Sequence, residues 1–307
     1  MSTPQRTRSP RLRRVAALGL LLAAVGLAVP DAGTASTQAS LTEFRKAAGV
    51  AVGDDDVVWI LGVGSDARPG EDMTRVRGDA IQLVGMDTAT GAATSIGIPR
   101  DAYVQIPGYG SDRINAAMVY GGPQLLGEAV QELVGVAPDY IFVTRFPFFE
   151  AMVDDIGGIS VDNPRAFSDS NLKDDGFDEG RIKLNGYDAM AFSRIRKTLS
   201  DGDFGRSANQ QRVLAGIQRK IGAKVDEPGF VDRGVLTVMK HTQTDLPPAD
   251  LFRIAHAIAQ VKPKKVTGCV VQGGIGDVGG ASVVLPDTAA AQRYGDDARD
   301  DAVIESC

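Results

Sequence analysis

Histidine and cysteine are almost missing from this sequence. The chain of 307 residues contains two histidines and two cysteines. Two histidines alone make a poor metal site, and neither cysteine has a histidine near it in sequence, so neither is predicted to be a catalytic nucleophile. Any catalytic chemistry is therefore expected to rest on other side chains.

An excess of positive charge is also lacking. Arginine and lysine number 33 against 39 aspartates and glutamates, which gives a net charge of −6 and an isoelectric point near 5.1. Such an acidic chain is a poor general binder of nucleic acid. An anionic ligand would have to be bound by a local basic cluster.

The N-terminal apolar run is too short to cross a bilayer comfortably. It covers residues 15–29, fewer than the roughly 20 residues that a membrane-spanning helix needs. Arginines precede the run and Pro30 ends it, a pattern typical of an export signal. Residues 1–35 are therefore predicted to be a signal peptide, with an uncleaved membrane anchor as the alternative. The rest of the chain is predicted to be extracytoplasmic, either secreted or anchored to the cell membrane facing the cell wall.

The two cysteines, Cys269 and Cys307, are predicted to form a disulfide, because an even pair in an exported protein favours bonding. The bond would close a loop of 38 residues. It would also hold residues 276–307, which otherwise have the composition of a flexible C-terminal tail. Two unpaired thiols are the alternative.

Apolar blocks predict strands that alternate with helices, and this order predicts a single α/β domain with a central mixed β-sheet flanked by helices. Residues 36–56 are small and polar and are predicted to be a linker with one helix at 41–48, before a folded domain at 57–275. Strands are expected at 57–63, 80–86, 92–98, 140–146, 159–161, 266–272 and 282–285. Helices are expected at 115–120, 123–133, 147–156, 187–197, 207–224 and 250–260, with a surface excursion at 165–181 and a loop at 198–205.

Arginines and aspartates gather in four segments at the ends of these elements, residues 64–68, 77–79, 99–101 and 194–211. Such ends are where α/β folds place ligand sites. Arginine binds phosphate oxygens with a fork of donors, and aspartate binds Mg²⁺, which also bridges phosphates. Any single segment of this kind is more often a salt bridge or a turn cap than a ligand site, so the prediction of a phosphate site depends on the four segments together.

The order and spacing of these segments resemble the LytR-CpsA-Psr family across residues 60–275. Three flanking positions depart from the family: Gly78 and Ala80 replace the usual Ser and Thr, and Ala67 stands where Ser is common. The charged groups are kept. The matching stretches are LGVGSDAR at 61–68, RGD at 77–79, SIGIPRD at 95–101, RINAA at 113–117, YGGP at 120–123, LNGYDA at 184–189 and the block at 194–211.

The resemblance implies an LCP-type fold and a phosphotransferase that moves a glycopolymer from a polyprenyl pyrophosphate carrier to peptidoglycan, forming a phosphodiester link. Its partners would be the polyprenyl pyrophosphate-linked glycopolymer, the peptidoglycan acceptor and the membrane surface, with no nucleic acid. The same residues would also suit a hydrolase that uses water as the acceptor. A non-catalytic lipid-carrier-binding or regulatory protein is the third hypothesis, which the full set of arginines and aspartates disfavours.

The resemblance also implies roles for individual residues. Asp66 and Asp79 would hold Mg²⁺, or Mn²⁺, between pyrophosphate oxygens. Asp203 would be the general base for the sugar hydroxyl, with orientation of charge as the alternative role. The pyrophosphate would be bound by Arg77, Arg100, Arg194, Arg196, Arg206 and Gln210, with Arg68 and Lys197 as secondary candidates; the predicted catalytic residues are Arg77, Arg100, Arg196 and Asp203.

Apolar helices at 123–133 and 146–156 are either walls of a channel for the polyprenyl chain or ordinary core. The sequence does not separate the two, and it does not specify the glycopolymer or the oligomeric state. The side chains concerned are Val130, Leu133, Phe148, Phe149, Met152 and Val153.

Overall fold

The computed structural model describes residues 38–46, 56–233 and 242–307. The predicted export segment, residues 1–35, lies outside these ranges, as do residues 47–55 of the predicted linker. Within the described ranges, no helix combines the length and the apolar composition needed to cross a membrane. The fold below belongs to the unit Thr37–Cys307.

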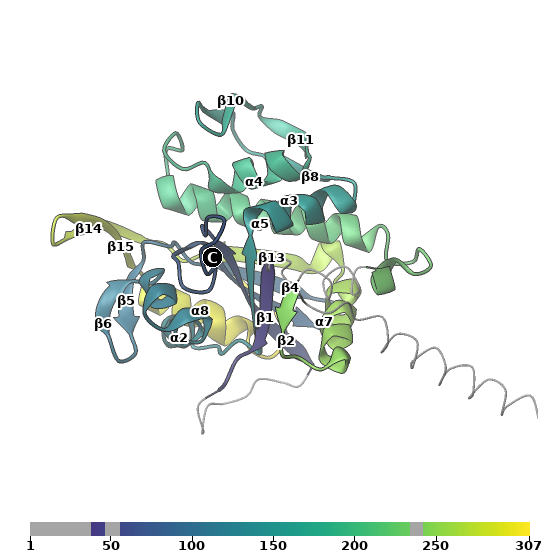
Figure 1. The fold of residues 1–307 in the computed structure, drawn as a ribbon, viewed down its shortest axis with the longest axis horizontal. Helices are drawn as coiled ribbons and strands as arrows, with labels where there is room; N and C mark the ends of the chain where they lie inside the picture. The colour runs from purple at the N-terminus through teal and green to yellow at the C-terminus, as the bar shows by residue number, and fades with distance from the viewer. Residues whose placement is uncertain (1–37, 47–55, 234–241) are drawn as a thin grey trace, which may run out of the picture. The chain divides into compact units, whose positions relative to one another are not determined.

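A mixed seven-stranded sheet forms the centre of this unit (Figure 1). In spatial order its strands are β12 (Thr242–Thr244), β1 (Ala39–Glu43), β7 (Tyr140–Arg145), β2 (Val57–Ser65), β3 (Gly78–Asp87), β4 (Ala93–Gly97) and β13 (Val266–Val270). β3 is antiparallel to both β2 and β4, whereas β7 is parallel to β2 and β13 is parallel to β4. The predicted central mixed sheet is confirmed.

Helices cover both faces of the sheet, as the continuous apolar run of β2 predicts. Leu61 and Val63 pack in one core with helices α2 (Ala116–Val134) and α8 (Thr288–Ala298). Val58 packs in a second core with helix α7 (Pro248–Gln260). Successive side chains of a strand point to opposite faces, so a strand that is apolar at every position needs cover on both sides.

A break interrupts α2 at Gly122, where φ is +75° and the backbone is not helical. The sequence predicts this break, with one helical segment at 115–120 and another opened by Pro123. Upstream of α2 the chain forms a hairpin of β5 (Tyr103–Ile106) and β6 (Gly110–Arg113). A short 3-10 turn, η1 (Pro263–Lys265), precedes β13.

A lobe of helices and short strands lies above the sheet in Figure 1 and has its own core. Its elements are α3 (Phe146–Asp155), β8 (Ile159–Asn163), β9 (Phe167–Asp169), β10 (Lys173–Phe177), β11 (Gly180–Leu184), α4 (Gly186–Arg194) and α5 (Gly202–Gly222). The predicted surface excursion at 165–181 is more ordered than expected. Phe167 and Phe177 pack on Phe192, with ring centroids 5.2 Å apart in each case.

The segment predicted as a linker contributes a strand to the sheet. β1 pairs with β12 on one side and with β7 on the other, and Leu41 is buried. The helix predicted at 41–48 is therefore wrong in its described part. Pairing on both sides overrides the weak local preference of this small, polar segment.

Residues 276–307 are not a flexible tail, as the sequence suggested, but fold onto the domain. β14 (Gly273–Val278) and β15 (Ala281–Pro286) form a hairpin, and α8 follows. Ala291 and Tyr294 of α8 belong to the main core. Gly295 allows close approach, because a Cβ there would clash with the carbonyl of Val134 in α2. The folded domain thus extends beyond residue 275.

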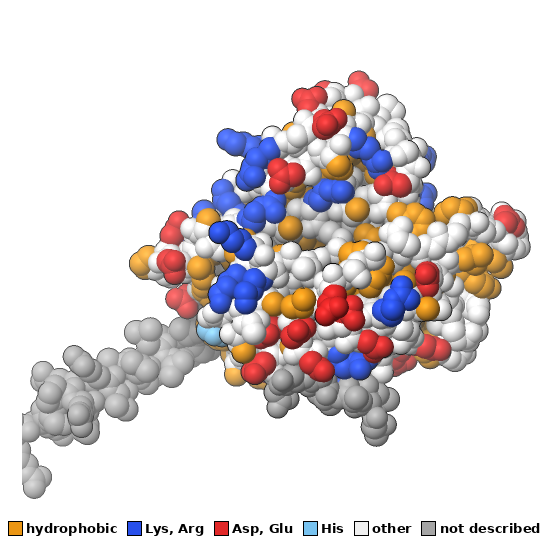
Figure 2. All heavy atoms as spheres, turned by 180° about the vertical axis from the view of Figure 1, so that it is seen from behind, with side chains coloured by type: hydrophobic (Ala, Val, Ile, Leu, Met, Phe, Trp, Pro, Cys, Tyr) orange, Lys and Arg blue, Asp and Glu red, His pale blue; other side chains and the backbone are white. Residues whose placement is uncertain are grey.

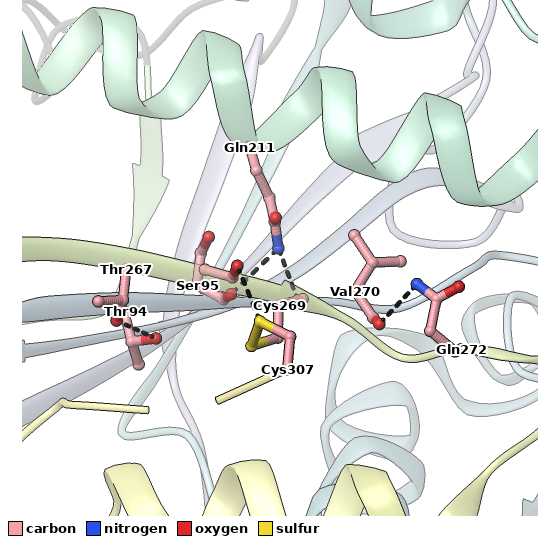
Figure 3. Close-up of a disulfide and its surroundings, with 9 residues drawn as sticks. Thr94, Ser95, Gln211, Thr267, Cys269, Val270, Gln272 and Cys307 are labelled. Atoms are coloured by element: carbon pink, nitrogen blue, oxygen red, sulfur yellow. Dashed lines mark hydrogen bonds between the residues drawn. A yellow bond between two sulfur atoms is a disulfide. The ribbon is translucent and has the colours of Figure 1, made fainter. Parts of the chain in front are cut away.

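A disulfide joins Cys269 in β13 to Cys307 at the C-terminus (Figure 3). Beside it, the side chain of Gln211 in α5 donates hydrogen bonds to the carbonyl oxygens of Ser95, at 3.0 Å, and Cys269, at 2.7 Å. Gln211 therefore holds α5 across the β4–β13 pair, close to where the disulfide anchors the chain end.

Cys307→Ser is expected to lower the melting temperature, because the opened loop raises the entropy of the unfolded chain. A loop closed by residues 38 apart corresponds to about 3–4 kcal/mol on the chain-entropy estimate. Thermal unfolding without reductant measures the loss. Wild type with reductant is the matched control and should unfold at the same temperature as the variant. A variant that melts at the same temperature as the oxidised wild type would contradict the prediction.

Candidate active site

Three neighbouring strands bring the first three arginine and aspartate segments to one edge of the sheet. β2 runs toward this edge, β3 runs away from it, and β4 returns to it. The end of β2, the start of β3 and the end of β4 therefore coincide. Segments 64–68, 77–79 and 99–101, which are far apart in sequence, meet there.

A β-bulge sets the position of Asp79. The register between β2 and β3 shifts beside this residue, so Asp79 has no partner in β2. A bulge bends the strand and re-aims a side chain. The guanidinium of Arg194 lies between the two predicted metal ligands, 3.0 Å from Asp66 and 3.5 Å from Asp79.

The ends of α4 and α5 bring the remaining arginines to the same edge. α4 ends at Arg194, and the buried Ile195 anchors the chain as it leaves the helix, so that Arg194 and Arg196 flank an apolar contact. The sequence predicts Asp203 in a loop, but the structure places it in the first turn of α5, where a carboxylate favours the helix dipole. Arg206 follows one turn later.

Arginine and aspartate alternate through the site as a series of ion pairs, here called the Asp–Arg network. Its first half runs from Asp66 through Arg194 to Asp79, which also pairs with Arg100. Arg100 Nε lies 3.8 Å from the carboxylate of Asp101. Each arginine of this half thus lies between two carboxylates.

The second half of the network continues from Asp101. Arg196 lies 2.9 Å from Asp101 and 4.0 Å from Asp203, and Arg206 forms the last pair with Asp203. Arg113 also approaches Asp101, at 3.8 Å. The structure therefore brings together four of the predicted pyrophosphate ligands, Arg100, Arg194, Arg196 and Arg206.

Burial and like charge act together on Asp66. Burial raises the pKa of the Asp66 carboxyl, the negative charge of Asp79 raises it further, and the guanidinium of Arg194 offsets only part of the rise. Burial alone would lower the pKa of Arg100, but the carboxylates of Asp79 and Asp101 outweigh it and raise that pKa. Additional positive charge near Asp66 would therefore be favourable.

The pair of Asp203 and Arg206 is the most deeply buried part of the network, with side chains 7% and 5% exposed. Burial lowers the pKa of Arg206, and the charge of Asp203 opposes that shift. Neither carboxylate oxygen of Asp203 accepts a hydrogen bond of ordinary geometry from a described residue. Charge, rather than hydrogen bonding, thus orients this carboxylate.

Gln210 connects the start of β3 to the end of α4 through its side-chain amide. Its side-chain oxygen accepts a hydrogen bond from Gln82 at 3.0 Å, and its amide nitrogen donates to the carbonyl oxygens of Asp79, at 3.4 Å, and Ser193, at 3.2 Å. These bonds use both amide hydrogens. The predicted hydrogen bond from Gln210 to a phosphate oxygen is therefore revised: this residue positions β3 against the end of α4.

Arg77, Arg68 and Lys197 are exposed at the rim of the site. Arg77 lies beside Tyr120 and lines a separate pocket with Arg113. Arg68 lies near Asp66 and acts on it through charge. These three cations surround the network without belonging to its chain of ion pairs.

Asp101, Arg113 and Phe146 were not among the predicted site residues. Asp101 contacts three arginines of the site. The ring of Phe146 packs under Arg194, with 4.1 Å between the guanidinium carbon and the ring centroid. Asp101 and Arg113 stand inside the motifs SIGIPRD and RINAA, which is a usable signal, whereas only the tertiary structure places Phe146.

Most side chains considered as channel walls pack as core. On the face shown in Figure 2, Lys and Arg side chains gather on the lobe and along its border, while hydrophobic side chains border the hollow beneath it. Val130, Leu133, Phe148 and Val153 are buried, whereas Phe149 and Met152 are partly buried against the lobe core.

A cluster of arginines and aspartates at a sheet edge is suited to binding a polyanion and stabilising charge on a transferring phosphoryl group. The family model LytR_cpsA_psr matches residues 28–299. The chain belongs to the LytR_cpsA_psr family. The match includes β1 and α8, consistent with a folded unit larger than residues 57–275.

Relatives of this LytR_cpsA_psr chain include a protein of Bacillus licheniformis named polyisoprenyl-teichoic acid–peptidoglycan teichoic acid transferase TagU. The two are 28% identical over 271 residues, which cover 83% of this chain and 86% of the relative. A structure of TagT bound to LIIa-WTA has a TM-score of 0.64 and 26% identity, covering 79% of this chain and 89% of that one. A structure of YwtF (TagT) with bound octaprenyl pyrophosphate lipid has a TM-score of 0.57 and 25% identity, covering 77% and 86%.

Arg206→Met is expected to destabilise the fold strongly, because it leaves the buried Asp203 with only the more distant Arg196, 4.0 Å away, as a partner. Breaking a buried ion pair from one side costs about 3–5 kcal/mol. The double variant Asp203→Asn/Arg206→Met should be more stable than Arg206→Met alone, since it removes the uncompensated charge. Chemical denaturation measures the free energies of unfolding.

The exposed pair of Arg181 and Asp162, 3.9 Å apart, provides the matched control. Arg181→Met should change stability by no more than about 1 kcal/mol. A double variant no more stable than Arg206→Met would show that the buried pair does not control stability.

Proposed function

We propose that this protein is a phosphotransferase that moves a glycopolymer from a polyprenyl pyrophosphate carrier to peptidoglycan and forms a phosphodiester link. The observation that carries the proposal is the convergence of Arg100, Arg194, Arg196 and Arg206 on one sheet edge, interleaved with aspartates. The name of the TagU relative and the ligands in the two TagT structures support it.

In the proposed reaction, a sugar hydroxyl of peptidoglycan attacks the phosphorus next to the glycopolymer. The bond from that phosphorus to the bridging oxygen breaks, and polyprenyl monophosphate leaves. Charge grows on the leaving phosphate, where the guanidinium groups of the network would stabilise it. Arg194 and Arg100 each lie between two aspartate carboxylates. Each guanidinium could therefore contact both phosphates of the carrier.

Asp203 is the proposed general base that takes the proton of the attacking hydroxyl. Its carboxylate lies beside Arg206 and 4.0 Å from Arg196, close to the groups that would hold the phosphates. Its two oxygens are buried and accept no ordinary hydrogen bond from a described residue, so the attacking hydroxyl would supply the missing donor once it reaches them. The alternative role is to orient Arg196 and Arg206 by charge.

We further infer that Asp66 and Asp79 bind Mg²⁺, or Mn²⁺. The fit rests on two carboxylates that face a common cation and on the raised pKa of Asp66, to which burial and Asp79 contribute. The described residues offer no group of three or more metal-ligating side chains. Water and phosphate oxygens would have to complete the coordination, as is usual for Mg²⁺. The bound ion would neutralise phosphate charge.

The proposed reaction places this site outside the cytoplasm, at the cell wall. The arginine-rich start and the apolar run at 15–29 have the pattern of an export signal. Whether the chain is released or stays anchored depends on residues 1–35, outside the described ranges.

Arg100→Ala and Asp203→Asn are each expected to slow glycopolymer transfer by more than tenfold, which corresponds to about 1.4 kcal/mol of barrier. The measurement is turnover of a polyprenyl pyrophosphate-linked sugar with Mg²⁺ and peptidoglycan fragments, followed by identification of the phosphodiester product. Arg181→Ala, which removes an exposed arginine from β11, is the control and should keep the wild-type rate.

Release of lipid phosphate without a linked product would favour a hydrolase over a transferase. Binding of the lipid without turnover, weakened but not abolished in the variants, would favour a carrier-binding role. Melting temperatures of both variants must be compared first, because Asp203 also belongs to the buried pair.

Mg²⁺ alone is expected to raise the melting temperature of the wild type and not that of Asp66→Asn. The physical reason is that the ion binds to the Asp66 and Asp79 carboxylates of the folded protein and not to the unfolded chain. Sodium chloride at equal ionic strength controls for screening. Equal shifts in both proteins would contradict binding at Asp66.

The same variant should respond to pH in a defined direction. The raised pKa of Asp66 means that its charged form is disfavoured in the folded state. Asp66→Asn should therefore not lower the melting temperature at pH 7 in the absence of the metal. Any rise in the melting temperature of the variant over that of the wild type should shrink as pH falls, because Asp66 of the wild type becomes protonated in both the folded and the unfolded state. A variant that melts below the wild type at pH 7 would contradict the prediction.

A further inference from the structure

A pocket of about 250 Å³ opens beside the Asp–Arg network. The β5–β6 hairpin and the start of α2 form one wall, with Asp112, Arg113 and Asn115. The β14–β15 hairpin forms the other wall with small apolar side chains, among them Val278. Arg113 joins the two walls, since its guanidinium donates a hydrogen bond to the carbonyl oxygen of Ser282 at 2.7 Å.

One buried polar atom at this pocket, the side-chain oxygen of Asn115, has no hydrogen-bond partner among the described residues. Nε of Arg113 makes no hydrogen bond either, but it faces the carboxylate of Asp101 at 3.8 Å. Asn115 is 2% exposed and stands at the N-cap of α2, yet its side chain makes no capping hydrogen bond. Asparagine at this position normally caps the helix. The wall of the pocket therefore contains one unused acceptor, which points to a ligand that can donate a hydrogen bond.

Two stacked tyrosines lie next to the wall of the pocket that contains Asp112. The rings of Tyr109 and Tyr120 lie 5.0 Å apart at an angle of 11°, and these residues are 58% and 41% exposed. The hydroxyl of Tyr120 donates a hydrogen bond to Asp112 at 2.5 Å, which connects the stack to the pocket wall. That bond and the charge of Asp112 raise the pKa of the Tyr120 phenol, so it remains a donor.

A pyranose ring matches these features. Its C–H bonds can pack on the electron-rich face of an exposed aromatic ring, and its hydroxyls both donate and accept hydrogen bonds. Arg77 and Arg113 offer donors to sugar hydroxyls, the carboxylate of Asp112 offers an acceptor, and the polar wall disfavours an acyl chain. The pocket is smaller than the roughly 300–1,000 Å³ of drug-sized sites, so it would hold a ring and not an extended polymer.

We propose that this pocket and the Tyr109–Tyr120 stack form a saccharide subsite, which holds a sugar of a wall glycan next to the reacting phosphate. The assignment to a wall glycan rests on the proposed function. Proximity supports it, because Arg113 lines the pocket and also lies 3.8 Å from Asp101 of the network. The acceptor strand and the donor glycopolymer both carry such rings.

The test uses the full chain and two soluble, lipid-free probes. One is a phosphate-free tetrasaccharide of N-acetylglucosamine and N-acetylmuramic acid, and the other is the donor sugar bearing a pyrophosphate without lipid. Titration calorimetry compares the wild type with Tyr109→Ala, a change at an exposed side chain that should leave the fold intact. Tyr187→Ala is the matched control, because Tyr187 is similarly exposed, at 46%, but lies in α4.

We expect Tyr109→Ala to weaken binding of the tetrasaccharide at least tenfold, with Tyr187→Ala unchanged and with equal melting temperatures. A loss confined to the donor probe would support the subsite and assign its ring to the donor. Tyr109-dependent sugar binding in a protein without turnover would overturn the proposed reaction while supporting the subsite. If neither probe binds, or both bind Tyr109→Ala as tightly as the wild type, the saccharide subsite is overturned.

Discussion

Mutual repulsion among arginines is the constraint on which this site depends. Two positive charges about 8 Å apart repel by about 2 kcal/mol at an effective dielectric constant of about 20. Arg100, Arg194 and Arg196 can share one sheet edge because carboxylates lie between them. The aspartates are therefore part of the fold as well as of the proposed chemistry.

This charge compensation also defines what a ligand must do. In the structure, most of the positive charge at the site is already paired, so a phosphate has to exchange places with carboxylates as it binds. A cation at Asp66 and Asp79 would make that exchange easier, since it would occupy the carboxylates that now hold Arg194. The metal and the pyrophosphate are thus expected to bind cooperatively.

Positioning of the network is achieved by groups that take no part in it. The bulge beside Asp79, the buried Ile195 and the paired amides of Gln82 and Gln210 fix where the charges point. Gln211 then ties α5 to the sheet next to the disulfide. The charged side chains consequently converge from elements that are held together by contacts outside the network, which favours pre-organised electrostatic stabilisation.

The sequence by itself determined the mixed α/β architecture, through its apolar runs and helix signals, and most of the chemistry, through its arginine and aspartate motifs. It predicted the strand at 282–285 but not its pairing with β14, and it did not reveal β1 or α8, because small polar and alanine-rich segments gain their order from pairing and close packing with distant elements. Only the tertiary structure showed that Gln210 is used internally and that Asp101 is shared by three arginines. Those facts depend on which hydrogen bonds and charges meet in space, and local sequence does not encode that.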